Sequence, residues 1–193
     1  ILAEPESSEY KSSAPLIKAM LNYGGYAQTY FNEKTDALAN KGLYNKTNDP
    51  VLTTNTTVSK DYNYAVFNNN IGVSFIGGSL VLNSGTDLKL YYSMDDQNMA
   101  HNINVSVNGQ NVAPEYDGNI MCVRVPDISI SSLGDTYNVK VSVNGKEINQ
   151  KYSAMTYMYK ALNSQNSNTK LNNVVKALYL YNEAAKQYSM EIE

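Results

Sequence analysis

Residues 171–189 read LNNVVKALYLYNEAAKQYS, and residues 16–31 near the other end of the chain read LIKAMLNYGGYAQTYF. The two stretches align without a gap and share five identical positions: Lys18 over Lys176, Ala19 over Ala177, Tyr23 over Tyr181, Ala27 over Ala185 and Tyr30 over Tyr188. This internal repeat predicts two related helices, one near each end of the chain. It predicts an architecture, and it carries no information about a biochemical activity.

Both copies place apolar or small residues at helical spacing, so each helix has one face to bury. In the N-terminal copy this face holds Leu16, Ile17, Met20, Gly24, Ala27 and Phe31. In the C-terminal copy it holds Leu171, Val174, Val175, Leu178, Asn182, Ala185 and Tyr188. Each glycine of the Gly24-Gly25 pair costs a helix roughly 1 kcal/mol relative to alanine. We therefore expect the pair to serve close packing, and a kink or break there is the alternative.

Composition limits the class of protein. The chain has 193 residues, 42% of them hydrophobic, which is typical of one large or two small globular domains. A formal net charge of -3 and the lack of any Lys/Arg run argue against a nucleic-acid surface. No apolar run approaches the ~18 residues that span a bilayer. We expect no nucleic-acid partner and no membrane insertion, with any export signal upstream of ILAEPESSEY.

The spacing of apolar residues changes to an alternation between residues 51 and 152, which is typical of half-buried strands. Asn108-Gly109 and Asn144-Gly145 match the dipeptides of tight hairpin turns, because both central residues of such turns need positive φ. Gly77-Gly78 and Ser84-Gly85 mark further turns. About seven short strands over roughly a hundred residues predict an immunoglobulin-like sandwich.

Residues 133–141, LGDTYNVKV, add a more local signal. They resemble the tyrosine corner of fibronectin type III and related sandwiches, in which a leucine lies four residues before a tyrosine whose hydroxyl binds upstream backbone. Leu133 and Tyr137 occupy those two positions here. The chain has one cysteine and no tryptophan, so the resemblance does not extend to antibody-type domains.

These signals predict an α+β fold: an immunoglobulin/fibronectin-III-like antiparallel β-sandwich with flanking helices from both termini packed together. The predicted domains are residues 1–50 (a helical segment and linker), 51–152 (the sandwich) and 153–193 (a helical hairpin). Within the first, residues 35–42 predict a short helical turn and residues 45–50 a linker. The apolar pair Ile1-Leu2 aligns near Ala161-Leu162, so we expect the chain to begin inside a repeat of a longer array.

The segments KAMLNYGGYAQTYF, VVKALYLYNEAAKQY and KYSAMTYMYKALN resemble modules of unknown function that recur near the ends of large secreted or surface-attached proteins of gut-dwelling clostridia. The resemblance spans nearly the whole chain. It implies an extracellular or cell-surface location, and neighbouring domains of the same longer protein as partners. Those modules have no established catalytic residues, so the resemblance implies no activity.

Residue types that carry chemistry are sparse, and we expect no enzyme activity, no catalytic residue, no metal and no cofactor. His101 is the single histidine and follows no nucleophile motif, and Cys122 is predicted to point away from the apolar face of its strand. The run Asp95-Asp96-Gln97-Asn98 is a candidate calcium loop, although an ordinary turn is the more usual reading. Asp95 with Glu115 is a candidate pair for glycoside hydrolysis.

Tyrosine is abundant, with 17 residues, and surface aromatics stack on sugars. Ten of these tyrosines fall in the helical stretches, where packing explains most of them. A loop or sheet-face platform has five candidates: Tyr62, Tyr64, Tyr91, Tyr92 and Tyr116. We therefore expect a non-catalytic structural or adhesion module of a larger bacterial surface or secreted protein. The alternatives are a carbohydrate-binding module that uses exposed tyrosines, or an accessory domain of a polysaccharide-degrading enzyme. A further expected partner is a glycan or protein of the host or of the cell wall.

Overall fold

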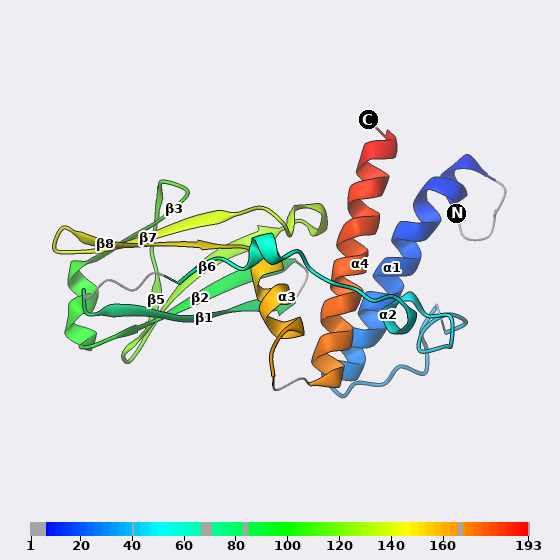
Figure 1. Cartoon of the computed structure of the whole chain (residues 1–193), viewed down its shortest axis with the longest axis horizontal. Helices are drawn as coiled ribbons and strands as arrows, with labels where there is room; N and C mark the ends of the chain where they lie inside the picture. The colour runs from blue at the N-terminus through cyan, green and yellow to red at the C-terminus, as the bar shows by residue number, and fades with distance from the viewer. Residues whose placement is uncertain (1–6, 40, 67–70, 83–84, 166–167, 193) are drawn as a thin grey trace. The chain divides into compact units, whose positions relative to one another are not determined.

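The computed structural model describes residues 7–39, 41–66, 71–82, 85–165 and 168–192. The chain is α+β: along the sequence, helices come first and last, and the strands of two antiparallel four-stranded sheets come between them (Figure 1). It divides into a helical unit, residues 1–58 and 158–193, and a sheet unit, residues 59–157. The described strands lie at residues 73–152, within the sandwich predicted for residues 51–152.

The helical unit is built on two long helices, α1 (Ser8–Tyr30) and α4 (Thr169–Ile192), which run side by side in opposite directions (Figure 1). Both helices are longer than the repeated stretches that predicted them. Ser7 caps the start of α1, because its side chain accepts a hydrogen bond from the Tyr10 N–H. No described helix has the length and hydropathy that crossing a membrane needs.

Equivalent residues of the repeat meet where the two helices pack. The rings of Tyr23 and Tyr181 stack with centroids 5.9 Å apart and an interplanar angle of 28°. At the end of the pair, Lys170 Nζ donates a hydrogen bond to Asn32 Oδ1 over 2.6 Å. In an antiparallel pair of related helices, equivalent residues can meet only near a local two-fold axis. Tyr23 and Tyr181 are such a pair of equivalent residues, and they meet where α1 and α4 pack.

The predicted buried face is observed in α4 and is wrong in part in α1. Val174, Val175 and Leu178 of α4 are buried as predicted. In α1, by contrast, Met20 is 42% exposed and Phe31 is 57% exposed. Five positions of α1 are buried instead, and all but Ser13 lie on another face: Ser13, Ala14, Asn22, Gly25 and Tyr26. The sequence pattern located an apolar stripe, and the structure leaves that stripe partly open.

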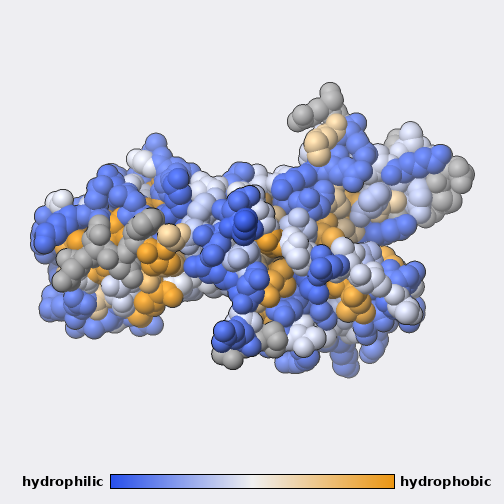
Figure 2. All heavy atoms as spheres, in the orientation of Figure 1, coloured by the Kyte–Doolittle hydropathy of each residue, from blue (hydrophilic) through white to orange (hydrophobic). Residues whose placement is uncertain are grey.

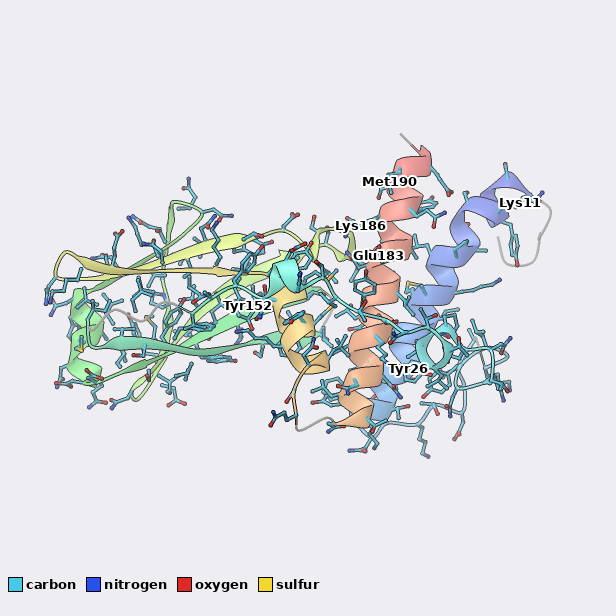
Figure 3. All side chains as sticks on the ribbon, viewed as in Figure 1. Lys11, Tyr26, Tyr152, Glu183, Lys186 and Met190 are labelled. Atoms are coloured by element: carbon cyan, nitrogen blue, oxygen red, sulfur yellow. The ribbon has the colours of Figure 1, made fainter. Side chains whose placement is uncertain are left out.

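A polar centre explains why the buried face of α1 differs from the predicted one. The carboxyl group of Asp49, which is fully buried, accepts hydrogen bonds from Asn22 Nδ2 at 3.1 Å and from Tyr26 Oη at 2.8 Å. It also accepts from the backbone N–H groups of Asn45 at 2.7 Å and Val51 at 2.9 Å. Figure 3 labels Tyr26 on α1. Burial, followed by the hydrogen bond to Asp49, raises the pKa of Tyr26.

The segment between α1 and the sheet unit is therefore not the linker that the sequence predicted. Asp49 caps the short helix α2 (Pro50–Thr53), whose Val51 packs with Tyr26 and α4 residues in the helical core. Residues 35–39 and 41–42 form turns rather than the predicted helical turn, with Leu38 N bonded to Thr35 O at 3.4 Å. The buried carboxyl group holds this segment against the helices, which a composition-based reading of residues 45–50 could not detect.

The sheet unit contains eight strands in the described part of the chain, against about seven predicted. The first sheet has the order β1-β2-β6-β5 and the second the order β4-β3-β7-β8. The strands are β1 (Val73–Leu82), β2 (Thr86–Met94), β3 (Ile103–Val107), β4 (Gln110–Val112), β5 (Glu115–Asp117), β6 (Ile120–Ile128), β7 (Tyr137–Val143) and β8 (Lys146–Tyr152). Short 3-10 helices are η1 (Lys60–Tyr62), η2 (Gln97–Asn102) and η3 (Ile130–Ser132). Helix α3 (Ala154–Leu162) follows β8, as predicted.

The inner faces of the two sheets meet around aromatic rings. Phe75 of β1 packs on Tyr92 of β2, with centroids 5.3 Å apart, and on Tyr152 of β8, with centroids 5.6 Å apart. Tyr152 also lies over Gly78, where an added Cβ would be 2.9 Å from the ring. Burial raises the pKa of Tyr152 to about 12. The Tyr92 hydroxyl is buried without a hydrogen-bond partner among the described residues.

Two of the predicted turns are confirmed and one is wrong. Asn108-Gly109 and Asn144-Gly145 close the β3–β4 and β7–β8 hairpins, and all four residues have positive φ. Gly77-Gly78 does not end a strand, because β1 continues through it with a bulge between Phe75 and Gly77. The Ser84-Gly85 turn includes residues outside the described ones.

Leu133 and Tyr137 lie where a tyrosine corner would place them, but the hydrogen bonds at this corner differ from those predicted. Leu133 is fully buried and Tyr137 begins β7. No described residue accepts a hydrogen bond from the Tyr137 hydroxyl. Two other tyrosines reach this corner instead: Tyr64 Oη lies 2.8 Å from Thr136 Oγ1, and Tyr62 Oη lies 2.7 Å from where a Cβ on Gly134 would be.

The glycine pair in α1 yields a matched test. An alanine Cβ at Gly25 would lie 2.8 Å from the Tyr44 ring, which is held by its hydroxyl contact with Thr29 and its edge-on packing with Tyr26. An alanine Cβ at Gly24 would meet nothing within 4 Å. We expect Gly24→Ala to raise the free energy of unfolding by about 0.5–1 kcal/mol through helix propensity. We expect Gly25→Ala to lower it by about 1–2 kcal/mol, because overpacking outweighs that gain.

Urea titrations followed by circular dichroism measure both changes. Equal effects of the two substitutions would contradict the packing of Tyr44 on Gly25.

Candidate functional site: the outer face of the β1-β2-β6-β5 sheet

The pairing register of the first sheet sorts its side chains between two faces. Leu88, Leu90 and Tyr92 of β2 are fully buried on the inner face. The residues between them face outward, and so do their partners across the sheet. The outer set comprises Ser79 of β1, Asp87, Lys89 and Tyr91 of β2, Cys122 and Arg124 of β6, and Glu115 of β5.

An ion pair holds one end of this outer face. Arg124, the single arginine of the chain, donates from Nε to Asp87 Oδ2 over 2.9 Å, and its Nη2 donates to the same oxygen. The backbone N–H of Asp127 donates to Asp87 Oδ1 over 2.9 Å. The Asp127 N–H and the guanidinium together lower the pKa of Asp87, and burial of its side chain opposes them. The Asp87 side chain is buried, but that of Arg124 is 48% exposed, so solvent reaches one partner of this pair.

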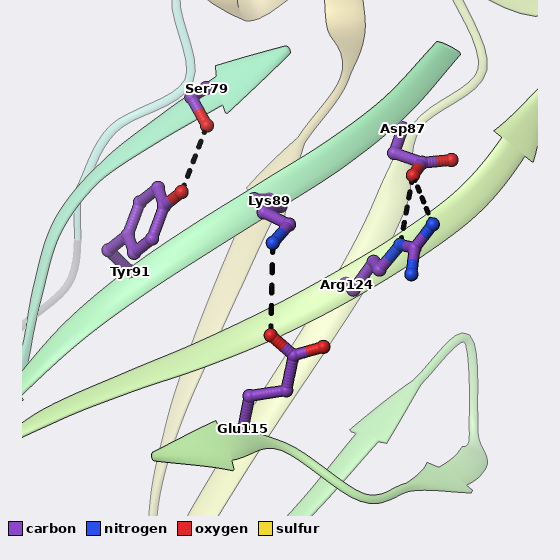
Figure 4. A network of polar contacts seen from close by, with 6 residues as sticks. All are labelled: Ser79, Asp87, Lys89, Tyr91, Glu115 and Arg124. Carbon is purple, nitrogen blue, oxygen red and sulfur yellow. Dashed lines mark hydrogen bonds and ion pairs between the residues drawn. The ribbon is translucent and has the colours of Figure 1, made fainter. Parts of the chain in front are cut away.

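Tyr91 lies at the middle of the same face. Its hydroxyl is 3.2 Å from Ser79 Oγ, and Lys89 Nζ is 3.7 Å from Glu115 Oε2 (Figure 4). Directly across from Tyr91 on β1 is Gly77, where an added Cβ would meet nothing within 4 Å. The half-buried Tyr91 ring therefore lies beside the space left by Gly77, and both hydrogen-bond donors and acceptors surround it. This arrangement is able to stack on a flat ligand and to hydrogen-bond its hydroxyl groups.

The five predicted platform tyrosines do not share a surface. Tyr92 is fully buried in the core, so its prediction as a platform residue is wrong. Tyr62 and Tyr64 hydrogen-bond or pack at the corner before β7. Tyr116 is 41% exposed, but it pairs with the buried Met121 and therefore lies on the inner side of edge strand β5. Tyr91 is the one predicted platform residue on the outer face.

The structure separates the residues predicted for metal or acid–base chemistry. Asp96 caps η2, because its Oδ1 accepts from both the backbone and the side-chain nitrogen of Asn98 at 2.9 Å. Among the described residues, no three His, Cys, Asp or Glu side chains form a group that could hold a metal ion. The Glu115 carboxylate is turned towards Lys89, away from Asp95, so the two do not face each other across a cleft.

The cysteine and the histidine lie in different elements, Cys122 in β6 and His101 in the 3-10 helix η2. Cys122 faces outward on β6, as alternation predicted, and neighbouring side chains leave it 8% exposed. Burial raises the pKa of its thiol, which favours the unreactive protonated form. His101 is exposed in η2, before β3 of the other sheet. The two residues form no dyad.

Comparison of the chain with models of protein families, with curated proteins and with solved structures gave no match. Sequence reasoning alone would have missed the Asp87–Arg124 pair. The two residues lie 37 positions apart and meet only because β2 pairs with β6. In that pairing Arg124 is opposite Lys89, which is two residues from Asp87 on the same face of β2.

The lowered pKa of Asp87 makes this part of the sheet sensitive to acid. Its ionised form contributes stability above the unfolded-state pKa of about 4, and this contribution is lost as pH falls through the lower folded-state pKa. We expect Asp87→Asn to lower the free energy of unfolding by about 1 kcal/mol at pH 7. Near pH 2.5 we expect that difference to shrink.

Urea titrations at the two pH values test this, with Asp36→Asn in an exposed turn as the matched control. An Asp87→Asn difference that is the same at both pH values would contradict the assignment.

Proposed function

We propose that this chain is a non-catalytic structural or adhesion module of a larger extracellular or cell-surface bacterial protein. The observation that carries the proposal is the stacking of Tyr23 on Tyr181 between two repeated helices. A segment that packs against its own repeat is suited to joining modules in series, because each new copy brings a surface that the previous copy already fits. Neighbouring domains of the same longer protein are the proposed partners.

The partly open stripe of α1 supports a neighbouring domain as partner. Met20 and Phe31 expose large apolar surfaces, and Gly24 between them leaves room for a backbone to approach. The repeat equivalents of Ile17 and Met20 in α4 are Val175 and Leu178, which are 3% and 1% exposed. We propose that an adjoining module covers the apolar residues of α1 that remain exposed, so that they become buried like their equivalents Val175 and Leu178 in α4.

We also propose that the sheet unit is an immunoglobulin-like or fibronectin type III-like sandwich. The strand orders support it: β1-β2-β6-β5 matches A-B-E-D of that fold, and β4-β3-β7-β8 matches C′-C-F-G. Tyr137 at the start of β7 has the position of the corner tyrosine before strand F. Such sandwiches serve many unrelated functions, so the fold by itself assigns none.

The proposed location is tested on the organism that makes the protein. We expect an antibody against this chain to label intact cells or the culture medium. Protease treatment of intact cells is expected to remove the cell label, while a cytoplasmic control protein survives. Recovery of the antigen in the cytoplasmic fraction alone would rule out an extracellular role.

Carbohydrate binding at Tyr91 is the second candidate function, favoured by the open position at Gly77 beside the ring. The test is a screen of the isolated chain on a glycan array and on purified cell walls. If sugar binds here, we expect Tyr91→Ala to weaken binding at least tenfold, since stacking on the ring is lost. Tyr116→Ala, an exposed tyrosine on the inner side of the sheet, is the matched control and is expected to bind normally.

Binding that survives Tyr91→Ala would contradict this site. No binding in either screen would leave the structural module as the proposed function.

A further inference from the structure

The helical unit contains a cavity of about 280 Å³ where α1, α2 and α4 come together. Its apolar wall comes from all three helices: Pro15 and Ala19 of α1, Pro50 and Val51 of α2, and Ala177 and Leu180 of α4. Ala19 and Ala177, which align in the repeat, contribute small side chains to this wall. Figure 2 shows hydrophobic atoms at the surface of the helical unit around α2.

The volume sets the size of a ligand. An apolar cavity of about 150 Å³ is large enough to bind benzene, and each non-hydrogen atom of a small ligand needs roughly 30 Å³ if it occupies the space of one liquid water. On this measure the cavity holds about nine or ten non-hydrogen atoms. The ligand is therefore smaller than a typical drug and has an apolar body.

The charges around the cavity set the orientation of a ligand. Lys18, exposed on α1, lines the cavity and supplies its one cationic group among the lining residues. Its Nζ lies 5.8 Å from the centre of the Tyr10 ring, a weak contact at an exposed site. At the other side of the wall, Asn22 donates to the buried carboxyl group of Asp49. An anionic group is therefore attracted at Lys18 and is unfavourable near Asp49.

We propose that this cavity binds a small amphiphilic carboxylate, with an unbranched or aromatic apolar body of about eight carbons inside and the carboxylate at Lys18. The apolar wall excludes a fully polar ligand, because its hydroxyl groups would lose their hydrogen bonds to water. The single cation distinguishes the carboxylate from a neutral compound of the same length. The site is separate from the outer face of the first sheet and requires no sugar.

Octanoate and 1-octanol are the matched probes, because they share the eight-carbon chain and differ in the charged end. The measurement is a titration of the intact chain, followed by the methyl NMR signals of Leu43, Val51 and Leu180, which line the cavity. We expect octanoate to shift these signals with a Kd between roughly 0.1 and 10 mM, in the range of small ligands. We expect Lys18→Gln to weaken octanoate three- to tenfold and to leave octanol unchanged.

Two further results distinguish cavity binding from adhesion to the surface. We expect Ala19→Leu, which fills the space, to abolish the shifts for both probes, and 0.5 M NaCl to weaken octanoate alone. If Ala19→Leu fails to fold, the salt effect and the Lys18→Gln comparison still decide. Absence of shifts at cavity methyl groups with wild-type protein would overturn the proposal. Equal effects of Lys18→Gln on both probes would overturn the role of Lys18.

Discussion

The buried carboxyl group of Asp49 accepts hydrogen bonds from two side chains of α1 and from two backbone N–H groups of the segment that follows α1. A buried acidic group is costly unless such partners satisfy it, so these contacts must form together or not at all. They determine which face of α1 is buried, because Asn22 and Tyr26 have to point towards Asp49. They also position α2, and with it Val51, against α4.

The helical unit also depends on the packing of α1 against α4. α1 and α4 come from opposite ends of the chain, and neither buries its apolar face alone. The loop between them includes the whole sheet unit, so their association must offset the entropy of closing a very long loop. The repeated apolar positions and the Tyr23–Tyr181 stack stabilise this association. The small residues Ala19 and Ala177 line the cavity next to the packed side chains.

The sheet unit depends on the alternation of side chains along β2. Tyr91 and Tyr92 are neighbours in sequence, yet one faces outward beside Gly77 and the other is fully buried against Phe75. Among the residues that the structure describes, the outer face consequently carries one aromatic ring among charged pairs instead of a row of rings. A function that uses this face must act through Tyr91 and the polar groups around it, or through no stacking at all.

Local features of the sequence determined much of the architecture. The α4 face follows from its spacing of apolar residues, the two Asn-Gly hairpins follow from their need for positive φ, and α3 is the first helix of the hairpin predicted for residues 153–193. The tertiary structure decided what depends on partners far away in the chain. Asp49 meets α1 residues 23 and 27 positions away, and Asp87 meets Arg124 37 positions away. Periodicity indicates that a residue is suited to burial, whereas only the fold determines which neighbour buries it. This is why the sequence did not predict the buried face of α1, the cavity, or the polar groups that surround Tyr91.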